Sequence, residues 1–109
     1  MPKRSEDISQ ELQELLVVSK TEWKETLSTW LSAFIRRAGV DYQYLSDELW
    51  NRFKVRQKVT NLRSKFSQGS VDGQLLLQIL LICNQRVSLE EIEEVYTRSV
   101  KKLREGNTP

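Results

Sequence analysis

The sequence predicts an all-helical protein of five or six helices. Apolar residues recur at intervals of three and four along most of the 109-residue chain, a spacing typical of amphipathic helices. Ser, Asp and Gly residues stand between these segments at positions where helices begin and end. A competing pattern occurs only over residues 52–59, where basic and apolar residues partly alternate. A strand would fit that alternation; we predict instead an extended loop from which Val55 and Phe53 reach the core.

The N-terminal part of the chain predicts two helices. Residues 5–18 carry Ile8, Leu12, Leu15 and Leu16 on one side of an amphipathic helix. A second helix is expected to begin at Ser19 or Thr21 and to end at Gly39, because Ser19 and Glu22 have the spacing of a capping box. Its wide apolar face, expected to enter the core, consists of Trp23, Leu27, Trp30, Leu31, Phe34 and Ala38.

Two shorter helices are predicted in the middle of the chain. Asp41 is placed to cap a helix over residues 42–51, and Gly69 to end one over residues 58–69 in a left-handed conformation. The apolar spacing of both segments predicts which side chains face inward. These are Leu45, Leu49, Val59, Leu62 and Phe66.

The last two helices are predicted over residues 73–84 and 88–104. Asp72 caps the first, whose LLLQILLIC segment is apolar nearly all round and predicts a central buried helix. Ser88 and Glu91 form a second capping box at the start of the other. Its apolar stripe predicts a homodimer interface; the alternative is that the stripe folds back onto its own domain. The apolar residues of this helix are Leu89, Ile92, Val95, Tyr96, Val100 and Leu103, and the stripe expected at the dimer interface consists of all of them except Val95.

Composition argues against an enzyme, a metal centre, a cofactor site and a small-molecule site. The chain has no histidine, which is the usual general base and the commonest metal ligand, and only one cysteine, Cys83. It has no glycine-rich phosphate loop, and its acidic cluster at residues 90–94 suits a helix N-terminus better than catalysis. The absence of a signal peptide, of a disulfide pair and of any apolar run near 18 residues predicts a cytoplasmic protein with no membrane span.

Positive charge is concentrated in one segment, residues 49–71. This segment has six basic residues and no acidic one, whereas the rest of the chain, with 11 basic and 15 acidic residues, carries −4. Such segregation is the electrostatic footprint of a protein that binds a polyanion, although a solvated charged helix would look the same. The six residues are Arg52, Lys54, Arg56, Lys58, Arg63 and Lys65.

Four short motifs occur in a meaningful order around this segment. They are EWK at residues 22–24, RRAGV at 36–40, NLRSKFSQG at 61–69 and LLQ at 76–78, with Leu45–Ser46 in the place of a Leu–Ala pair. Their order resembles the lambda-repressor-like helix-turn-helix family of phage repressors and Xre-type regulators. The pattern is most similar to a small prokaryotic branch with an NLRNKISRG-like recognition helix. The link between Leu49 and Leu62 is longer than in phage repressors.

The resemblance implies a lambda-repressor-like helix-turn-helix domain at residues 21–86. Residues 1–20 would be an N-terminal helical extension, and residues 87–109 a C-terminal helix and tail that serves dimerisation. The implied function is sequence-specific binding of double-stranded DNA in transcription regulation, with the helix at 58–66 in the major groove. The implied DNA-binding residues are Tyr42, Gln43, Arg52, Lys54, Arg56, Gln57, Lys58, Thr60, Asn61, Arg63, Ser64, Lys65 and Gln68.

Two other functions fit the same residues. The chain could be a protein-interaction module, either an adaptor or an antitoxin-like subunit, that uses its terminal amphipathic helices. It could also bind RNA or single-stranded nucleic acid without sequence preference, which requires aromatic stacking platforms among the basic residues. Trp50 and Phe53 are the candidates for such platforms.

Overall fold

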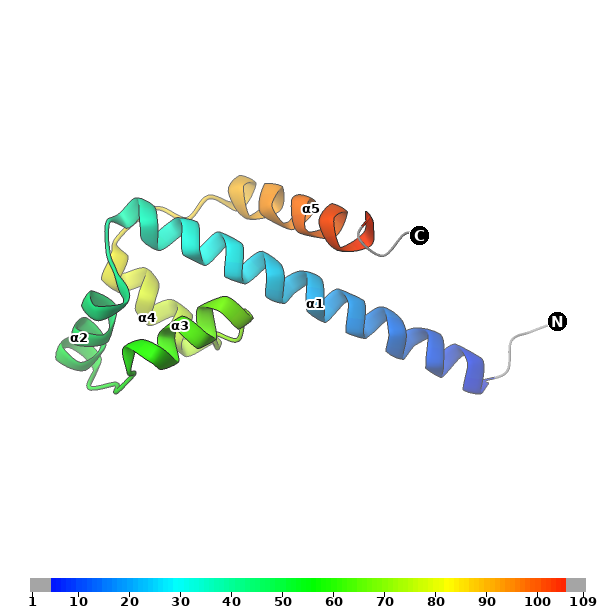
Figure 1. The fold of residues 1–109 in the computed structure, drawn as a ribbon, viewed down its shortest axis with the longest axis horizontal. Coiled ribbons are helices and arrows are strands. Elements are labelled where there is room, and N and C mark those ends of the chain that lie inside the picture. Colours follow the sequence, from blue (N-terminus) through cyan, green and yellow to red (C-terminus); the bar gives the residue numbers. More distant parts are fainter. Residues whose placement is uncertain (1–4, 106–109) are drawn as a thin grey trace.

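The computed structural model contains five α-helices and, within residues 5–105, no β-strand (Figure 1). It describes the backbone of residues 5–105 and the side chains of residues 19–104. The helices are α1 (Ser5–Ala38), α2 (Tyr42–Phe53), α3 (Val59–Gln68), α4 (Gly73–Cys83) and α5 (Leu89–Glu105). The all-helical prediction is therefore confirmed. None of these helices, α1 included, combines the length and the apolar composition needed to cross a membrane.

The predicted break before residue 21 is wrong, because α1 is one continuous helix of 34 residues. Neither Gly nor Pro occurs in it, so nothing in its backbone forces a stop. Glu22, the expected capping-box partner of Ser19, is instead 2% exposed and accepts a 2.9 Å hydrogen bond from Arg104 Nε. The apolar residues expected on one side of residues 5–18 lie outside the described side chains.

The predicted caps of the middle helices are confirmed. Asp41 Oδ1 accepts a 2.8 Å hydrogen bond from the Tyr44 N–H, and Asp72 Oδ1 does the same for the Leu75 N–H. Gly69 ends α3 in the left-handed region with φ 61°. The first of the two middle helices, α2, runs two residues past its predicted end, to Phe53, and Lys54 closes it in the left-handed region with φ 57°.

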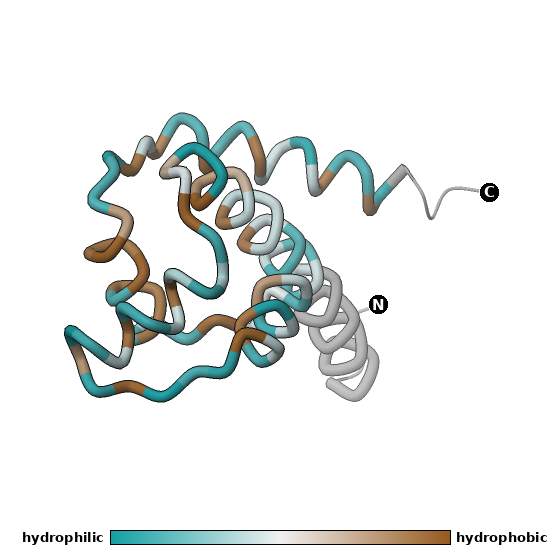
Figure 2. Tube along the Cα trace, turned by 60° about the vertical axis from the view of Figure 1, so that its left-hand side comes forward, coloured by the Kyte–Doolittle hydropathy of each residue, from teal (hydrophilic) through white to brown (hydrophobic). Residues whose placement is uncertain are grey.

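The core lies where the C-terminal half of α1 meets the three short helices (Figure 2). α3 packs on α1 and α2, and α4 packs on α2. Every inward-facing residue predicted for α2 and α3 is buried except Val59, which is half-buried. Val55 and Phe53 pack against the edge of the core as predicted, although Phe53 does so from the last turn of α2 and only Val55 from the loop that follows. The fully buried residues that join the elements are Leu31, Phe34, Leu45, Leu49, Leu62, Phe66 and Ile79.

The prediction that α4 is buried all round is wrong. Leu75, Ile79 and Ile82 are buried, but Leu77 and Leu81 on the other side of the helix are each 63% exposed. With five helices, only one face of α4 is covered, chiefly by α2. The segment therefore contains more apolar residues than the tertiary structure buries.

The final helix α5 packs back on α1 in the antiparallel sense (Figure 1). Val95 is buried, and the Tyr96 ring stacks on Trp23 with 4.3 Å between ring centroids. Trp23 was expected in the core but is 50% exposed, because its ring covers Tyr96 instead of the interior. Salt bridges join the two helices at both ends: Arg37–Glu91 at 2.6 Å, Lys102–Glu25 at 2.9 Å and Arg104–Glu22 at 2.9 Å.

Candidate nucleic-acid interface

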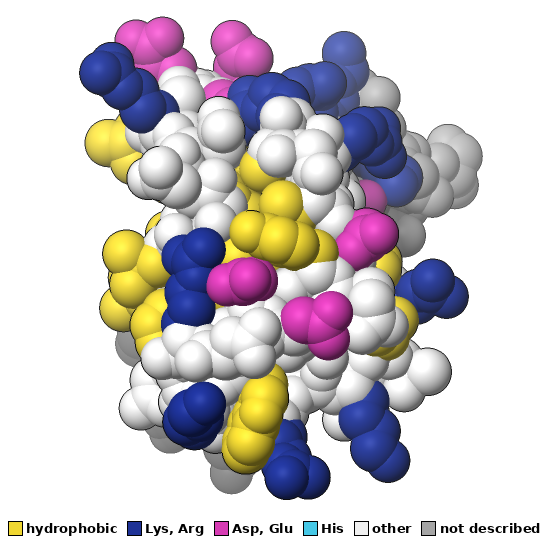
Figure 3. All heavy atoms as spheres, turned by 90° about the vertical axis from the view of Figure 1, so that its left-hand side faces the viewer, with side chains coloured by type: hydrophobic (Ala, Val, Ile, Leu, Met, Phe, Trp, Pro, Cys, Tyr) yellow, Lys and Arg dark blue, Asp and Glu magenta, His cyan; other side chains and the backbone are white. Residues whose placement is uncertain are grey.

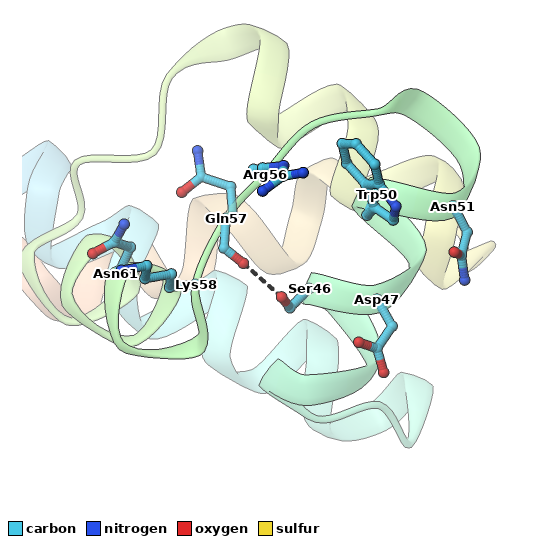
Figure 4. A pocket seen from close by; sticks show the side chains of 8 residues that line it. All are labelled: Ser46, Asp47, Trp50, Asn51, Arg56, Gln57, Lys58 and Asn61. Carbon is cyan, nitrogen blue, oxygen red and sulfur yellow. Dashed lines mark hydrogen bonds between the residues drawn. The ribbon is translucent and has the colours of Figure 1, made fainter.

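Residues 54–58, between α2 and α3, form a five-residue segment that is held at several points. Left-handed Lys54 donates its N–H to the Trp50 carbonyl at 3.0 Å, which is the αL type of helix end, and the Val55 N–H donates to the Leu49 carbonyl at 3.1 Å. The Ser46 hydroxyl on α2 donates to the Gln57 carbonyl at 2.6 Å (Figure 4). Exposure alternates along the segment: Lys54, Arg56 and Lys58 are exposed, whereas Val55 and Gln57 are half-buried.

An exposed tryptophan supports two of these cations. Trp50, in the last turns of α2, is 41% exposed. The Arg56 guanidinium carbon lies 4.7 Å from its ring centroid and the Lys54 Nζ lies 5.3 Å from it, both within cation–π range. Trp50 is therefore partly covered by cations of this chain.

The first half of α3 presents polar side chains to solvent. Because Leu62 and Phe66 are fully buried against α1 and α2, the opposite face of the helix carries Thr60, Asn61, Arg63 and Ser64, all exposed. The Arg63 guanidinium carbon lies 5.7 Å from the Tyr42 ring centroid. Lys65 is half-buried, and Gln68 is exposed at the far end of α3, away from the loop.

The predicted residues of α2 have partners within the chain. Tyr42 is half-buried, with its ring edge-on to Phe66 at 5.2 Å, so it supports the α2–α3 packing. The Gln43 side-chain amide donates to Asp47 Oδ1 at 3.0 Å. Arg52 donates to Glu48 Oε2 at 2.6 Å, and this hydrogen bond raises the pKa of its guanidinium. Its charge is thus matched by a neighbouring carboxylate.

A concavity of about 670 Å³ lies between α2, the loop and the start of α3 (Figure 4). Side chains from α2 form one wall, and those of the loop and α3 form the other. Asp47 places one carboxylate in a lining that is otherwise neutral or basic. The lining residues are Ser46, Asp47, Trp50, Asn51, Arg56, Gln57, Lys58 and Asn61.

Basic side chains dominate one edge of the molecule. In Figure 3, Lys and Arg side chains flank an apolar one along the lower edge, with no Asp or Glu between them, whereas carboxylates appear higher on the same face. Within the described residues no group of three or more His, Cys, Asp or Glu side chains is placed to hold a metal ion. The positive charge along this edge is that of Lys and Arg side chains.

A family model described as a domain of unknown function, DUF6471, matches residues 23–86. The chain belongs to this family. No curated protein and no solved structure matches the chain. The family domain thus includes the C-terminal half of α1 together with α2, α3 and α4, and it contains the whole candidate interface, whereas α5 lies outside it.

Within the family domain, the structure brings together most of the predicted site residues but not all of them. Most of those in the loop and on α3 lie on adjoining exposed surfaces, whereas Tyr42, Gln57 and Lys65 are half-buried and Gln68 lies at the other end of α3. Sequence reasoning missed Ser46, Asp47 and Asn51 as neighbours of the basic loop. Their signal was present, since positions 46, 47, 50 and 51 share one face of a helix at i, i+3 and i+4 spacing.

Proposed function

We propose that the protein binds double-stranded DNA sequence-specifically and regulates transcription, with α2, the loop at 54–58 and α3 as its helix-turn-helix unit. One observation carries this proposal. The three cations of the loop and the polar side chains of Thr60, Asn61, Arg63 and Ser64 on α3 are exposed on adjoining surfaces, and no acidic residue occurs between positions 49 and 71. A polyanion that presents hydrogen-bonding edges matches both features.

In this proposal the exposed face of α3 enters the major groove. The Asn61 side-chain amide has the donor and acceptor needed to pair with adenine, and the Arg63 guanidinium has the paired donors needed for guanine. Thr60 and Ser64 lie on the same exposed face and contribute hydroxyls. The buried Leu62 and Phe66 hold the helix rigidly, so its polar face is presented without rearrangement.

The two other functions are less well supported. The interaction-module hypothesis depended on free apolar stripes on the terminal helices, but Val95 and Tyr96 of α5 already contact α1 within the chain. The single-strand hypothesis needs open aromatic platforms. Trp50 is partly covered by Lys54 and Arg56, and Phe53 packs against the core.

The test is fluorescence anisotropy with random duplex DNA, followed by selection of a preferred site. Wild-type protein is expected to bind random DNA weakly and the selected site much more tightly. Asn61→Ala and Arg63→Ala should each cost about 1–3 kcal/mol on the selected site and little on random DNA. Lys101→Ala, which removes an exposed cation of α5, is the matched control and should change neither affinity.

Two results would overturn this proposal. The first is that folded wild-type protein binds no duplex DNA at low salt. The second is that selection yields no preferred site and that Asn61→Ala and Arg63→Ala bind every duplex as wild type does.

A further inference from the structure

We propose that residues 54–58 are a backbone-tracking segment: Lys54, Arg56 and Lys58 contact successive phosphates of one DNA strand, and Trp50 positions Arg56 for this contact. The inference rests on the proposed DNA-binding function and names the part of the duplex that these residues recognise. It separates them from Asn61 and Arg63, which face the bases in that proposal.

The spacing of the three cations suits a row of phosphates. They occupy alternate positions, and all three side chains are exposed while Val55 and Gln57 between them are half-buried. In an extended chain, residues two apart are separated by about 7 Å at most. Successive phosphates on one DNA strand are separated by a comparable distance, so each cation can face one phosphate.

The segment is held in place before any ligand binds. The Val55 N–H bonds the Leu49 carbonyl, the Val55 side chain packs against the core, and the Gln57 carbonyl accepts from Ser46. A loop fixed at both ends loses little conformational entropy on binding. The Val55 N–H and the Gln57 carbonyl are thus bonded to α2, whereas the three basic side chains are exposed to a ligand.

Trp50 restricts the Arg56 side chain. The guanidinium carbon lies over the indole ring, 4.7 Å from its centroid and within cation–π range. The planar guanidinium carries its N–H donors at its edge, where a phosphate oxygen can accept two of them. The Lys54 ammonium near the same ring adds a second cation beside the first.

Two carboxylates on α2 limit where the strand can lie. Glu48 accepts a hydrogen bond from Arg52, whereas Asp47 lines the concavity beside Arg56 and Lys58 and accepts a hydrogen bond from the neutral Gln43 amide. The Asp47 charge opposes any phosphate that enters the concavity. The inference therefore places the strand along the outer edge of the loop, and Asp47→Asn should tighten binding to every duplex.

The first experiment measures affinity for the selected site and for random duplex over a range of salt concentrations. Lys54→Ala, Arg56→Ala and Lys58→Ala should each weaken binding to both duplexes by the same factor. Each should also make the slope of log K against log salt shallower by about 0.9, the value for one phosphate contact. Lys101→Ala should leave the slope unchanged, which controls for net charge.

Trp50 is tested with a double variant. Trp50→Ala should make the slope of log K against log salt shallower, as Arg56→Ala does. The double variant Trp50→Ala/Arg56→Ala should bind DNA no more weakly than Arg56→Ala alone. Trp50→Phe keeps an aromatic face and should restore most of the slope. A purely structural tryptophan would instead lower the melting temperature without changing the slope of the protein that remains folded.

The second experiment replaces single phosphates of the selected site with neutral methylphosphonates. Neutralising any one of three consecutive linkages on one strand should weaken binding by the wild-type protein. The alanine variant that lacks the cation facing a given linkage should bind equally well whether or not that linkage is neutral. The inference is overturned if the sensitive linkages are scattered, or if the three variants lose affinity only for the selected site with the salt slope unchanged. In either case Asn61→Ala and Arg63→Ala would still report on the proposed function separately.

Discussion

At the scale of single residues, Gly69 lies where the end of α3 packs closely against the backbone of α1. Its φ of 61° lies in the left-handed region, and a Cβ built there would lie 2.0 Å from the Lys24 carbonyl oxygen. Backbone atoms cannot move aside as a flexible side chain can. Gly69→Ala should therefore combine left-handed strain of about 1–2 kcal/mol with an overpacking cost of about 1–3 kcal/mol. Urea denaturation measures the loss in the free energy of unfolding.

Gly39 is the matched control for this prediction. Its φ of 71° is similar, but a Cβ there would meet no atom within 4 Å. Gly39→Ala should cost only the left-handed strain, about 1–2 kcal/mol. Equal losses for the two variants would contradict the close contact between α3 and α1.

The buried thiol of Cys83 makes stability depend on pH. Burial at the end of α4 raises the pKa of this thiol above its ordinary value. The unfolded chain therefore releases the thiol proton at a lower pH than the folded chain, and stability is lost as pH rises above the ordinary thiol pKa of about 8.5. The loss of the free energy of unfolding between pH 8 and pH 10 should be smaller in Cys83→Ala than in wild type.

Thiol titration checks the same point directly. At pH 8 the native protein should react slowly with a disulfide reagent, and the urea-unfolded chain should react at once. Immediate stoichiometric reaction of the native protein would show that Cys83 is accessible.

At the scale of elements, α4 has one covered and one open face. Ile79 is fully buried and Leu77 is 63% exposed, although both stand in the same apolar run. Ile79→Asp should cost several kcal/mol, because it buries a charge without a partner. Leu77→Asp places the same residue type in the same helix and should change stability by less than about 0.5 kcal/mol. Thermal melting followed by circular dichroism compares the two; similar melting temperatures would mean that α4 is oriented differently.

The contact between α1 and α5 is held by different kinds of interaction along its length. Trp23 stacks on Tyr96 in the turn of α1 that also carries Glu22 and Glu25, which pair with Arg104 and Lys102 of α5, and Arg37 pairs with Glu91 at the other end of the contact. Exposed pairs such as Arg37–Glu91 contribute little, typically about 0–1 kcal/mol. Glu22 differs because its carboxylate is buried and accepts a hydrogen bond from Arg104. That bond ties the end of α5 to the middle of the long helix.

At the scale of the whole molecule, the predicted homodimer now rests on less than the sequence implied. The dimer prediction required a free apolar stripe on α5, but Tyr96 of this stripe stacks on Trp23 of α1. The alternative, that the stripe folds back onto its own domain, thus applies at Tyr96, whereas Leu89 is 79% exposed. The N-terminal half of α1 extends beyond the other helices (Figure 1). Two-fold DNA readers gain affinity from two half-sites about one turn of DNA apart. Sedimentation equilibrium at tens of micromolar should give twice the mass of the chain, and a monomer there would contradict the prediction.

Much of the fold was determined locally by the sequence. Asp41 and Asp72 bond N–H groups three residues ahead, and Gly39 and Gly69 end their helices with positive φ. These events involve only residues within a turn or so of each other, so a sequence pattern suffices to predict them. The same holds for the segregation of six cations in residues 49–71 and for the inward face of α3.

Only the tertiary structure decided which surfaces are covered. Glu22 is held by Arg104, 82 positions away, so the local capping box was not used and α1 continued without a break. Leu77 is exposed because no helix of the described chain covers it, and Arg56 lies against Trp50 because the loop folds back over α2. Each outcome depends on how elements far apart in the sequence pack together, and the local spacing of apolar residues does not predict that packing.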